Sequence, residues 1–278
     1  MYPMDRRTFL TGSAAWLAGA AATYAFWPSK GKGGGEDIRG RIARGDAPPT
    51  PGPYAREAYA YRKLASRQVA CKVCPHGCVL APGDRSVCRS KVNIDGTLYT
   101  LAYGNPCAVH VDPVEKKPLF HFLPGSRSFS IATVGCNFRC SFCQNADIAQ
   151  MPSDREGTIL GTRCTPGDVV DAAQRGGCRS IAYTYTEPTV FFEFAYETAK
   201  LAHEQGIRNV FVTNGYMTAE ALEMIEPYLD AANVDLKAFT EDFYHKLTGG
   251  HLDPVLDTLK YIHNEPDVWL EITTLLIT

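Results

Sequence analysis

The sequence of 278 residues has no strong bias in charge. Its formal net charge is −2, and it contains no run of six like charges. Because nucleic-acid phosphates bind to a clustered cationic face, this composition excludes nucleic acid as the main partner. Repeats of solenoid length are also missing, which excludes a stacked-repeat architecture. With 45% hydrophobic and 21% charged residues, the chain can build one large domain and a small one.

Long apolar stretches are scarce as well. The uncharged run from Ala14 to Trp27 is shorter than the ~20 residues of a spanning helix and suits the core of a signal peptide. It follows Arg6-Arg7, which is typical of a twin-arginine signal. We therefore expect residues 1–30 to be such a signal or an uncleaved membrane anchor, with an ordinary N-terminal helix as the alternative.

This signal predicts an exported protein, either periplasmic or held at the membrane through residues 1–30 alone. The protein would be cytoplasmic if the signal is not functional. Residues 31–65 are rich in glycine, proline and charge, so they cannot bury enough apolar surface to fold. We expect them to form a flexible linker.

Cysteine, in contrast, is abundant and clustered. Seven of the ten cysteines form two groups: Cys71, Cys74, Cys78 and Cys88, then Cys136, Cys140 and Cys143. The short spacings favour metal ligation, because disulfides usually join cysteines from separate segments. The scattered Cys107, Cys164 and Cys178 are interpreted as small buried hydrophobic residues.

From residue 128 onward, apolar runs alternate with helical patterns. The runs are residues 129–135, 180–186, 209–213, 232–238 and 269–277. The helix signals are N-caps with a following proline at Thr165-Pro166 and Asp253-Pro254, and C-cap glycines at Gly176 and Gly206. Strands that alternate with helices indicate a parallel sheet. We therefore expect an α/β fold, a partial (β/α) barrel, over residues 128–278.

Polar residues come at the ends of four of these runs. They are Cys136, Glu187, Asn214 and Lys237. In a parallel barrel the carboxyl ends of the strands carry the functional groups, so these side chains should share one end. The last run reaches the final residue, Thr278, without a following helix. We expect the barrel to be truncated at the C-terminus, since an uncovered strand is an exposed edge.

The spacing C-x3-C-x2-C from Cys136 to Cys143 points to an iron–sulfur cluster. Three thiolates on one loop can bind three irons of a [4Fe–4S] cubane and leave the fourth iron open to a substrate. Structural zinc would need a fourth cysteine or histidine nearby, and none follows closely.

With Phe142 directly before its last cysteine, this motif resembles the signature of the radical S-adenosylmethionine (SAM) superfamily. Other stretches resemble one branch, the radical SAM enzymes of the AmmeMemoRadiSam system, which are similar to glycyl radical (pyruvate formate-lyase) activating enzymes. These stretches are residues 71–88, 112–119, 183–188, 213–216, 235–237 and 247–250. Together they cover about residues 70–278.

The resemblance implies an oxidoreductase with a [4Fe–4S] cluster and SAM as cofactors. The cluster would cleave SAM reductively to a 5′-deoxyadenosyl radical, which abstracts hydrogen from a protein or a small molecule. An electron donor of the ferredoxin or flavodoxin type is implied, together with Memo-like partners of the system. The hard chemistry then belongs to the cofactors, and the protein positions them.

The resemblance also assigns roles to five residues. Glu187 would contact the SAM amino group, Asn214 would lie near the ribose, and Phe142 would belong to the cofactor site. Asp235 and Lys237 would be catalytic, near SAM and the substrate backbone. The alternatives are a surface glutamate at a helix start, an asparagine of a turn, and an internal salt bridge.

The first cysteine group lies in residues 66–127, which we expect to form a small N-terminal module. Cys71, Cys74, Cys78 and Cys88 make a complete ligand set for zinc or for a second iron–sulfur cluster. Stapling disulfides are a third alternative, because an exported protein meets an oxidising space. The residues that follow predict a hairpin with a tight turn at Asp95-Gly96.

Two other classes of function stay open at the level of the sequence. One is an iron–sulfur electron-transfer protein without catalysis, and the other is a zinc-binding interaction module. An acid at Glu187 and a barrel-like alternation argue against the electron-transfer protein, because a carrier needs no SAM pocket. Iron and sulfide analysis after anaerobic purification would separate the zinc module.

Overall fold

The computed structural model describes residue 52, residues 54–155 and residues 157–276. The predicted signal or anchor, residues 1–30, lies outside the described residues, as does most of the predicted linker. Within the described ranges, no helix combines the length and the apolar character that crossing a bilayer requires.

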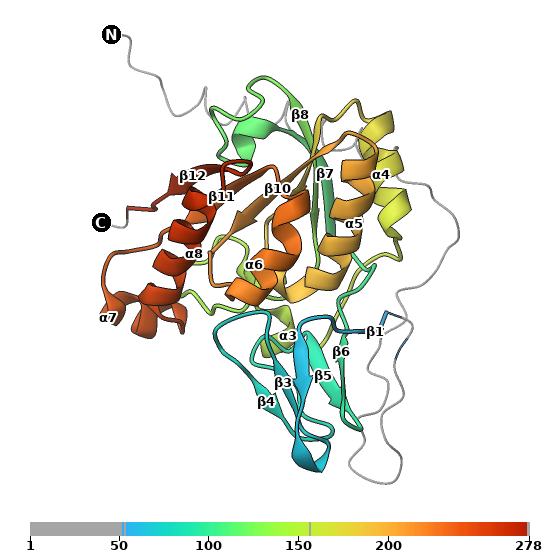
Figure 1. Ribbon diagram of the computed structural model, residues 1–278, viewed down its shortest axis with the longest axis vertical. Helices are drawn as coiled ribbons and strands as arrows, with labels where there is room; N and C mark the ends of the chain where they lie inside the picture. Colours follow the sequence, from blue (N-terminus) through green and yellow to red (C-terminus); the bar gives the residue numbers. More distant parts are fainter. Residues whose placement is uncertain (1–51, 53, 156, 277–278) are drawn as a thin grey trace, which may run out of the picture. The chain divides into compact units, whose positions relative to one another are not determined.

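A six-stranded sheet forms the larger part of the described chain (Figure 1). Its strands lie in the order β12-β11-β10-β9-β8-β7, and neighbours from β8 to β12 are parallel. Each of the five predicted apolar runs overlaps one of the strands from β8 to β12. The bounds are β7 (Ala108–Pro113), β8 (Arg127–Ala132), β9 (Ser180–Tyr183), β10 (Arg208–Thr213), β11 (Ala231–Asp235) and β12 (Trp269–Thr273). The α/β prediction is confirmed, and the open sheet agrees with a partial barrel.

Strand β7 was not predicted from the sequence. It pairs antiparallel with β8 at one edge of the sheet, although it lies within residues 66–127. The predicted boundary between residues 127 and 128 falls inside β8, which begins at Arg127 and pairs with β7.

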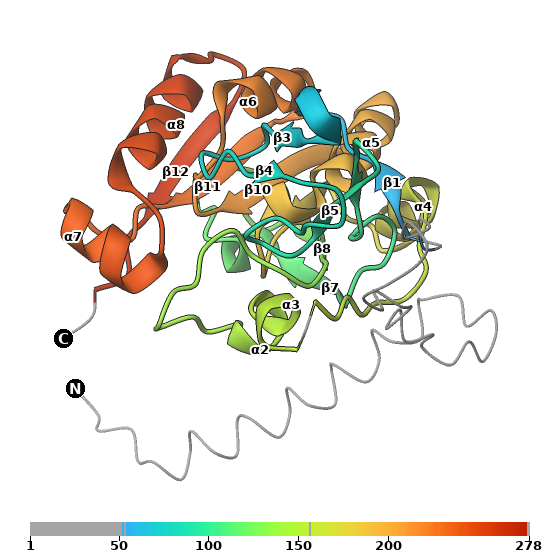
Figure 2. The ribbon, with the colours of Figure 1, turned by 90° about the horizontal axis from the view of Figure 1, so that it is seen from below.

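Four helices lie along one side of this sheet (Figure 2): α4 (Pro166–Arg175), α5 (Phe192–Glu204), α6 (Ala219–Ile225) and α8 (Leu252–Asn264). The predicted cap of α4 is confirmed, because Thr165 and Asp168 form a reciprocal capping box. For α8 the predicted cap was wrong. His251 is its N-cap, and Asp253 lies inside the first turn, where its charge favours the helix dipole.

Glycines lie at the ends of α4 and α5, as predicted. Gly176 is the C-cap residue of α4, and the following Gly177 takes the left-handed conformation. Gly206 follows the C-cap residue of α5 and takes the left-handed conformation with φ 71°.

Shorter helical segments connect these elements. The α-helical ones are α2 (Ala146–Ala149), α3 (Met151–Asp154) and α7 (Glu241–Phe243). The 3-10 turns are η2 (Ala65–Arg67), η3 (Val114–Lys116), η4 (Pro188–Phe191) and η5 (Glu226–Tyr228), and η6 (Tyr244–Thr248) is a π-helix.

Two three-stranded antiparallel sheets precede the large sheet in the chain. One has the order β1 (Arg56–Glu57), β6 (Thr97–Thr100), β5 (Lys91–Ile94). The other has the order β2 (Tyr61–Lys63), β3 (Val69–Cys71), β4 (Val79–Leu80). The predicted hairpin is confirmed as β5–β6, with positive φ at Asp95 and Gly96 as a tight turn requires.

Strands β1 and β2 correct the predicted linker, which extended to residue 65. Both strands pair with neighbours, and Ala58 and Ala60 between them are buried. Backbone pairing orders this short stretch, although its composition resembles that of a linker.

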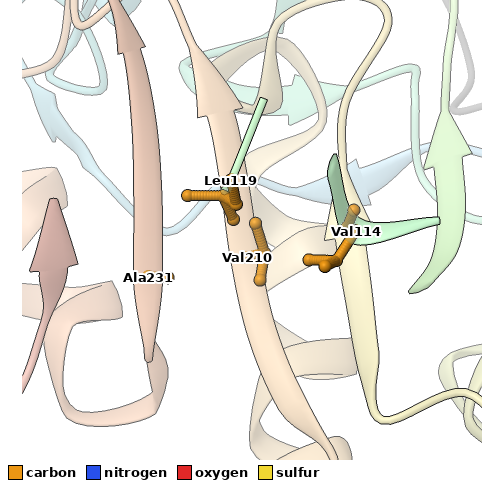
Figure 3. Close-up of a cluster of buried hydrophobic side chains, with 5 residues drawn as sticks. Val114, Leu119, Val210 and Ala231 are labelled. Atoms are coloured by element: carbon orange, nitrogen blue, oxygen red, sulfur yellow. The ribbon is translucent and has the colours of Figure 1, made fainter. Parts of the chain in front are cut away.

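A segment after β7 fills the inner side of the large sheet (Figure 3). Val114 and Leu119 are fully buried against Ala182, Val210 and Ala231. Neighbouring residues of β10 point the other way, since Asn209 Nδ2 donates to the carbonyl of Ala199 in α5. We name the segment Val114–Leu119 the plug. The plug makes up most of the stretch 112–119 that the sequence analysis singled out.

Candidate functional site

The predicted cluster ligands lie on the loop that follows β8. Burial raises the pKa of the Cys136 thiol well above its usual value, and the nearby charges of Glu187, Cys140 and Cys143 raise it further. All three cysteines are partly exposed. The structure thus brings the three predicted ligands together at one place.

The cysteine loop is held by backbone hydrogen bonds to the end of the π-helix η6. The N–H of Arg139 donates to the carbonyl of Thr248 at 2.7 Å, and Ser141 donates to Leu247 at 3.0 Å. At Gly250 the two segments approach so closely that a Cβ atom would lie 2.2 Å from the Phe138 ring. The stretch 247–250 therefore supports the loop, a role that the sequence alone did not reveal.

The donor set fits a cluster better than a single ion. Among the residues that the structure describes, no three Cys, His, Asp or Glu side chains converge tightly enough to hold one metal ion. A cubane is larger than an ion and keeps its cysteines apart, and three ligands leave one iron open. Two donors face Cys136 Sγ: the N–H of Phe138 at 3.4 Å and Nδ2 of Asn214 at 3.8 Å. Such donors stabilise a thiolate, so the residues present fit a [4Fe–4S] cluster.

Glu187 follows β9 and is only 1% exposed. Its Oε1 accepts from the Thr213 hydroxyl at 2.8 Å, and its Oε2 accepts from the Asn214 N–H at 2.9 Å. Burial raises the pKa of Glu187 to about 7, although these donors oppose the shift. The alternative of a surface glutamate is wrong, even though Glu187 caps η4 by accepting from the Thr189 N–H.

Asn214 connects this carboxylate to the cysteine loop. Its Nδ2 donates to Asn137 Oδ1 at 2.7 Å, and its Oδ1 accepts from the Tyr216 N–H at 2.9 Å. Asn214 therefore serves a turn and faces the site at once. The sequence analysis missed Asn137, for which the sole signal is its place directly after Cys136.

Asp235 and Lys237 lie on another side of the loop. Lys237 Nζ is 2.9 Å from Asp235 Oδ2, so the predicted pair exists. Strand β11 ends at Asp235, so the prediction that Lys237 lies in the strand was wrong. Burial raises the pKa of Cys140 to about 11, Lys237 opposes this and Asp235 adds to it. The pair thus reaches the cluster ligands electrostatically, while its catalytic role stays a prediction.

Phe142 makes no contact that identifies a cofactor. Its ring packs against Phe243 of α7 with centroids 5.6 Å apart. This contact fixes the cysteine loop against α7, and the predicted cofactor role stays a prediction.

The other cysteines behave differently from one another. Cys164 and Cys178 are buried as expected, but Cys107 is partly exposed. None of the ten cysteines, all of which lie in described residues, forms a disulfide. The four cysteines of the N-terminal group line one hollow, which is partly open to solvent.

Comparisons with known proteins agree with this geometry. The chain is 44% identical over 222 residues to the uncharacterized protein MJ0808 of Methanocaldococcus jannaschii, covering 80% of this chain and 65% of that protein. It is 29% identical to the pyruvate formate-lyase-activating enzyme of Streptococcus mutans, covering 53% of this chain and 58% of the enzyme. The enzyme of the same name from Clostridium pasteurianum is also 29% identical, covering 51% and 58% of the two chains. The chain therefore spans between about half and two thirds of the length of these relatives.

A family model covers the part of the chain that carries the site. The model of the Radical SAM superfamily matches residues 130–277, more than half of the sequence. This range holds the cysteine loop, Glu187, Asn214 and the pair Asp235–Lys237. On this match, the chain belongs to the Radical SAM superfamily.

Proposed function

We propose that the protein holds a [4Fe–4S] cluster on Cys136, Cys140 and Cys143 and cleaves SAM reductively. Membership of the superfamily implies both the cluster and SAM. The observation that carries the proposal is the buried carboxylate of Glu187, which Asn214 connects to Asn137, the residue directly after Cys136. A SAM-binding enzyme has a use for this carboxylate near the cluster, whereas an electron carrier or a zinc module has none.

When bound, the cluster supplies the electron that splits SAM into methionine and a 5′-deoxyadenosyl radical, which then takes a hydrogen atom from the substrate. The chain's own residues bind and orient. The Glu187 carboxylate receives the ammonium group of SAM in a charge-assisted hydrogen bond. The hydroxyl of Thr213 and the N–H of Asn214 keep that carboxylate in place.

Lys237 and Asp235 offer a cation and an anion whose charges act on Cys140. Their side chains are 16% and 37% exposed, so the pair is open to an approaching molecule. We propose that the pair orients the substrate backbone by hydrogen bonds beside Cys140. A purely internal salt bridge would predict that its removal changes stability and leaves substrate binding unaltered.

The substrate belongs to this proposal too. Two relatives are named as activating enzymes of pyruvate formate-lyase, which supports a protein substrate of the glycyl radical kind. A small molecule is the second candidate. The proposal also includes membership of the AmmeMemoRadiSam branch and Memo-like partners. It further includes a ferredoxin- or flavodoxin-type donor and export through residues 1–30. Deuterium transfer from a labelled substrate into 5′-deoxyadenosine would distinguish a protein from a small molecule.

The test of SAM cleavage uses the protein purified without oxygen and reduced with dithionite. We expect Cys136→Ala, Cys140→Ala and Cys143→Ala each to abolish 5′-deoxyadenosine formation, while Cys107→Ser serves as the matched control. SAM should perturb the electron paramagnetic resonance signal of the reduced wild-type protein, because it ligates the open iron. Undiminished 5′-deoxyadenosine in an alanine variant would overturn the assignment. A cluster signal that SAM leaves unchanged would favour an electron carrier.

A further inference from the structure

The hollow in the N-terminal part of the chain gathers four thiols from separate elements. Cys71 ends β3, Cys74 and Cys78 lie on the loop between β3 and β4, and Cys88 precedes β5. All four line the hollow.

Hydrogen-bond groups surround two of these sulfur atoms. The N–H of Val87 donates to Cys78 Sγ at 3.4 Å. The hydroxyls of Ser86 and Ser90 lie 3.1 Å and 3.0 Å from Cys88 Sγ. Sulfur is a weak acceptor as a thiol and a stronger one as a thiolate, so this arrangement suits deprotonated ligands.

A buried cation adjoins the same hollow. Lys91 lines it and is only 1% exposed, and its Nζ lies 2.7 Å from both carboxylate oxygens of Glu193. Burial lowers the pKa of Lys91, but Glu193, Cys71 and Cys88 raise it, and the net shift is upward. Glu193 balances the charge of this ammonium group, so the ion pair holds the β5 side of the hollow against α5.

The two small sheets have a small core, which includes Val69, Leu80 and Leu98. Their strands are two to four residues long, and Val79 and Val87 beside the cysteines are 58% and 57% exposed. Strands this short around so small a core gain stability from a disulfide or a metal. No disulfide joins any of the ten cysteines.

We propose that Cys71, Cys74, Cys78 and Cys88 hold a second [4Fe–4S] cluster, which passes electrons to the cluster of the cysteine loop. Four neighbouring thiolates can complete the ligation of a cubane. A zinc ion would need the four sulfur atoms drawn in to about 2.3 Å from one point. Among the described residues, no set of three ligands converges in this way.

The hollow borders the cysteine loop directly. Asn137, which directly follows Cys136, also lines the hollow. His76 Nε2 lies 2.7 Å from the carbonyl oxygen of Asn137. A Cβ atom on Gly135 would lie 3.7 Å from the carbonyl oxygen of Cys88. This contact gives one electron a short path through the protein.

The transfer balances without any bond change. A ferredoxin- or flavodoxin-type donor loses one electron, the second cluster gains it, and the second cluster then reduces the first. This relay rests on the proposed function, whereas the presence of the second cluster does not.

The test separates the two sites by variants. We expect about eight irons and eight sulfides per wild-type chain, since each [4Fe–4S] cluster contributes four of each. Changing Cys136, Cys140 and Cys143 together to Ala should halve the iron and leave a cluster signal that SAM does not perturb. Changing Cys74 and Cys78 to Ser should also halve the iron but leave a signal that SAM perturbs. Cys107→Ser should keep all of the iron.

Three outcomes would overturn the second cluster. They are iron near zero in the triple-alanine variant, one zinc per chain in that variant, or disulfides among the four cysteines in anaerobic protein by mass spectrometry. Because the triple-alanine variant keeps these four cysteines, the result does not depend on the folding of the Cys74 and Cys78 variant. If SAM leaves the cluster signal of the wild type unchanged while the triple-alanine variant still holds four irons, the proposed function is refuted and the second cluster is not.

The relay has its own measurement. With a reduced flavodoxin as the donor, the Cys74 and Cys78 variant should lose SAM cleavage, while dithionite should still support it. Equal rates with both reductants would overturn the relay and leave the second site without an electron-transfer role.

Discussion

At the scale of single residues, Glu187 combines full burial with a position beside the cysteine loop. Its carboxylate has donors on both oxygens and no cation as a hydrogen-bond partner among the described residues. A buried carboxylate without a cation is costly to keep ionised, which is why burial raises its pKa to about 7. An ammonium group of SAM would supply the missing positive charge.

The first prediction is that Glu187→Gln weakens SAM binding by about 1.5–3 kcal/mol, the contribution of a hydrogen bond to a charged group. Equilibrium dialysis with labelled SAM under anaerobic conditions measures the change, and the iron content should stay that of the wild type. The control is Glu204→Gln, because Glu204 is exposed at the end of α5. Unchanged affinity in the Glu187 variant would limit this residue to capping η4.

The second prediction concerns pH and the metal-free protein. Because the pKa of Glu187 in the folded protein is about 7 against a usual 4.5, the folded chain keeps a proton that the unfolded chain releases. The wild type should therefore lose about 3 kcal/mol of stability relative to Glu187→Gln as the pH rises from 4.5 through 7. Urea unfolding of both proteins at several pH values measures this difference. A constant difference across the range would contradict the raised pKa.

The sequence predicted the residues of the site better than their connections. Cys136 and Glu187 could be found because each ends an apolar run, and strand ends meet in a parallel sheet. Asn137 could not, since an asparagine inside a cysteine motif gives no signal until the fold brings Asn214 to it. For Lys237 the pairing with Asp235 was found, but the predicted run 232–238 was longer than the strand, which ends at Asp235.

At the scale of elements, the plug shows how a loop acts as part of the core. Leu119 is fully buried on the inner side of the sheet, and Asn233 Nδ2 donates to the neighbouring Pro118 carbonyl at 3.0 Å. The inner faces of the strands are thus covered by a connection and the outer faces by helices.

The third prediction is that Leu119→Ala destabilises the protein by about 2–5 kcal/mol, because it opens a cavity between the plug and the strands. The matched control is Phe120→Ala, since Phe120 is 60% exposed. Chemical unfolding of the metal-free proteins measures both. Similar losses in the two variants would show that the plug is not part of the core.

Local signals explain which elements could be predicted. Buried parallel strands give continuous apolar runs, and Thr165 and Asp168 predict the capping box of α4. Strand β7 could not be predicted because its residues are mostly half-buried, and because its order depends on pairing with β8. The same holds for β1 and β2, whose short pairing depends on partners far along the chain.

At the scale of the whole molecule, one buried ion pair joins the small sheets to the large one. Lys91 belongs to β5 and Glu193 to α5, and both side chains are at most 2% exposed. Removing one partner of such a pair leaves an uncompensated buried charge, whereas replacing both with apolar residues is often tolerated.

The fourth prediction is that Glu193→Ala destabilises the protein by about 3–5 kcal/mol, and that Lys91→Met recovers much of the loss in the double variant. Thermal and urea unfolding measure both. The control is Asp257→Ala, because the pair Asp257–Lys260 is exposed and contributes little. A double variant no more stable than Glu193→Ala would contradict an electrostatic cause.

The plug has a further consequence for how a target, meaning the substrate of the proposed reaction, can reach the site. It packs against β9, β10 and β11 through Ala182, Val210 and Ala231, while Cys136, Glu187 and Asn214 follow the C-terminal ends of their strands. The plug therefore fills the inner face of these strands, and under the proposed function a target would approach from the end where the cysteine loop lies. A folded protein can meet this demand by releasing a short segment of its own chain into the opening. The stability of that segment in the partner, rather than the reactivity of its hydrogen atom, would then set how fast the partner is modified.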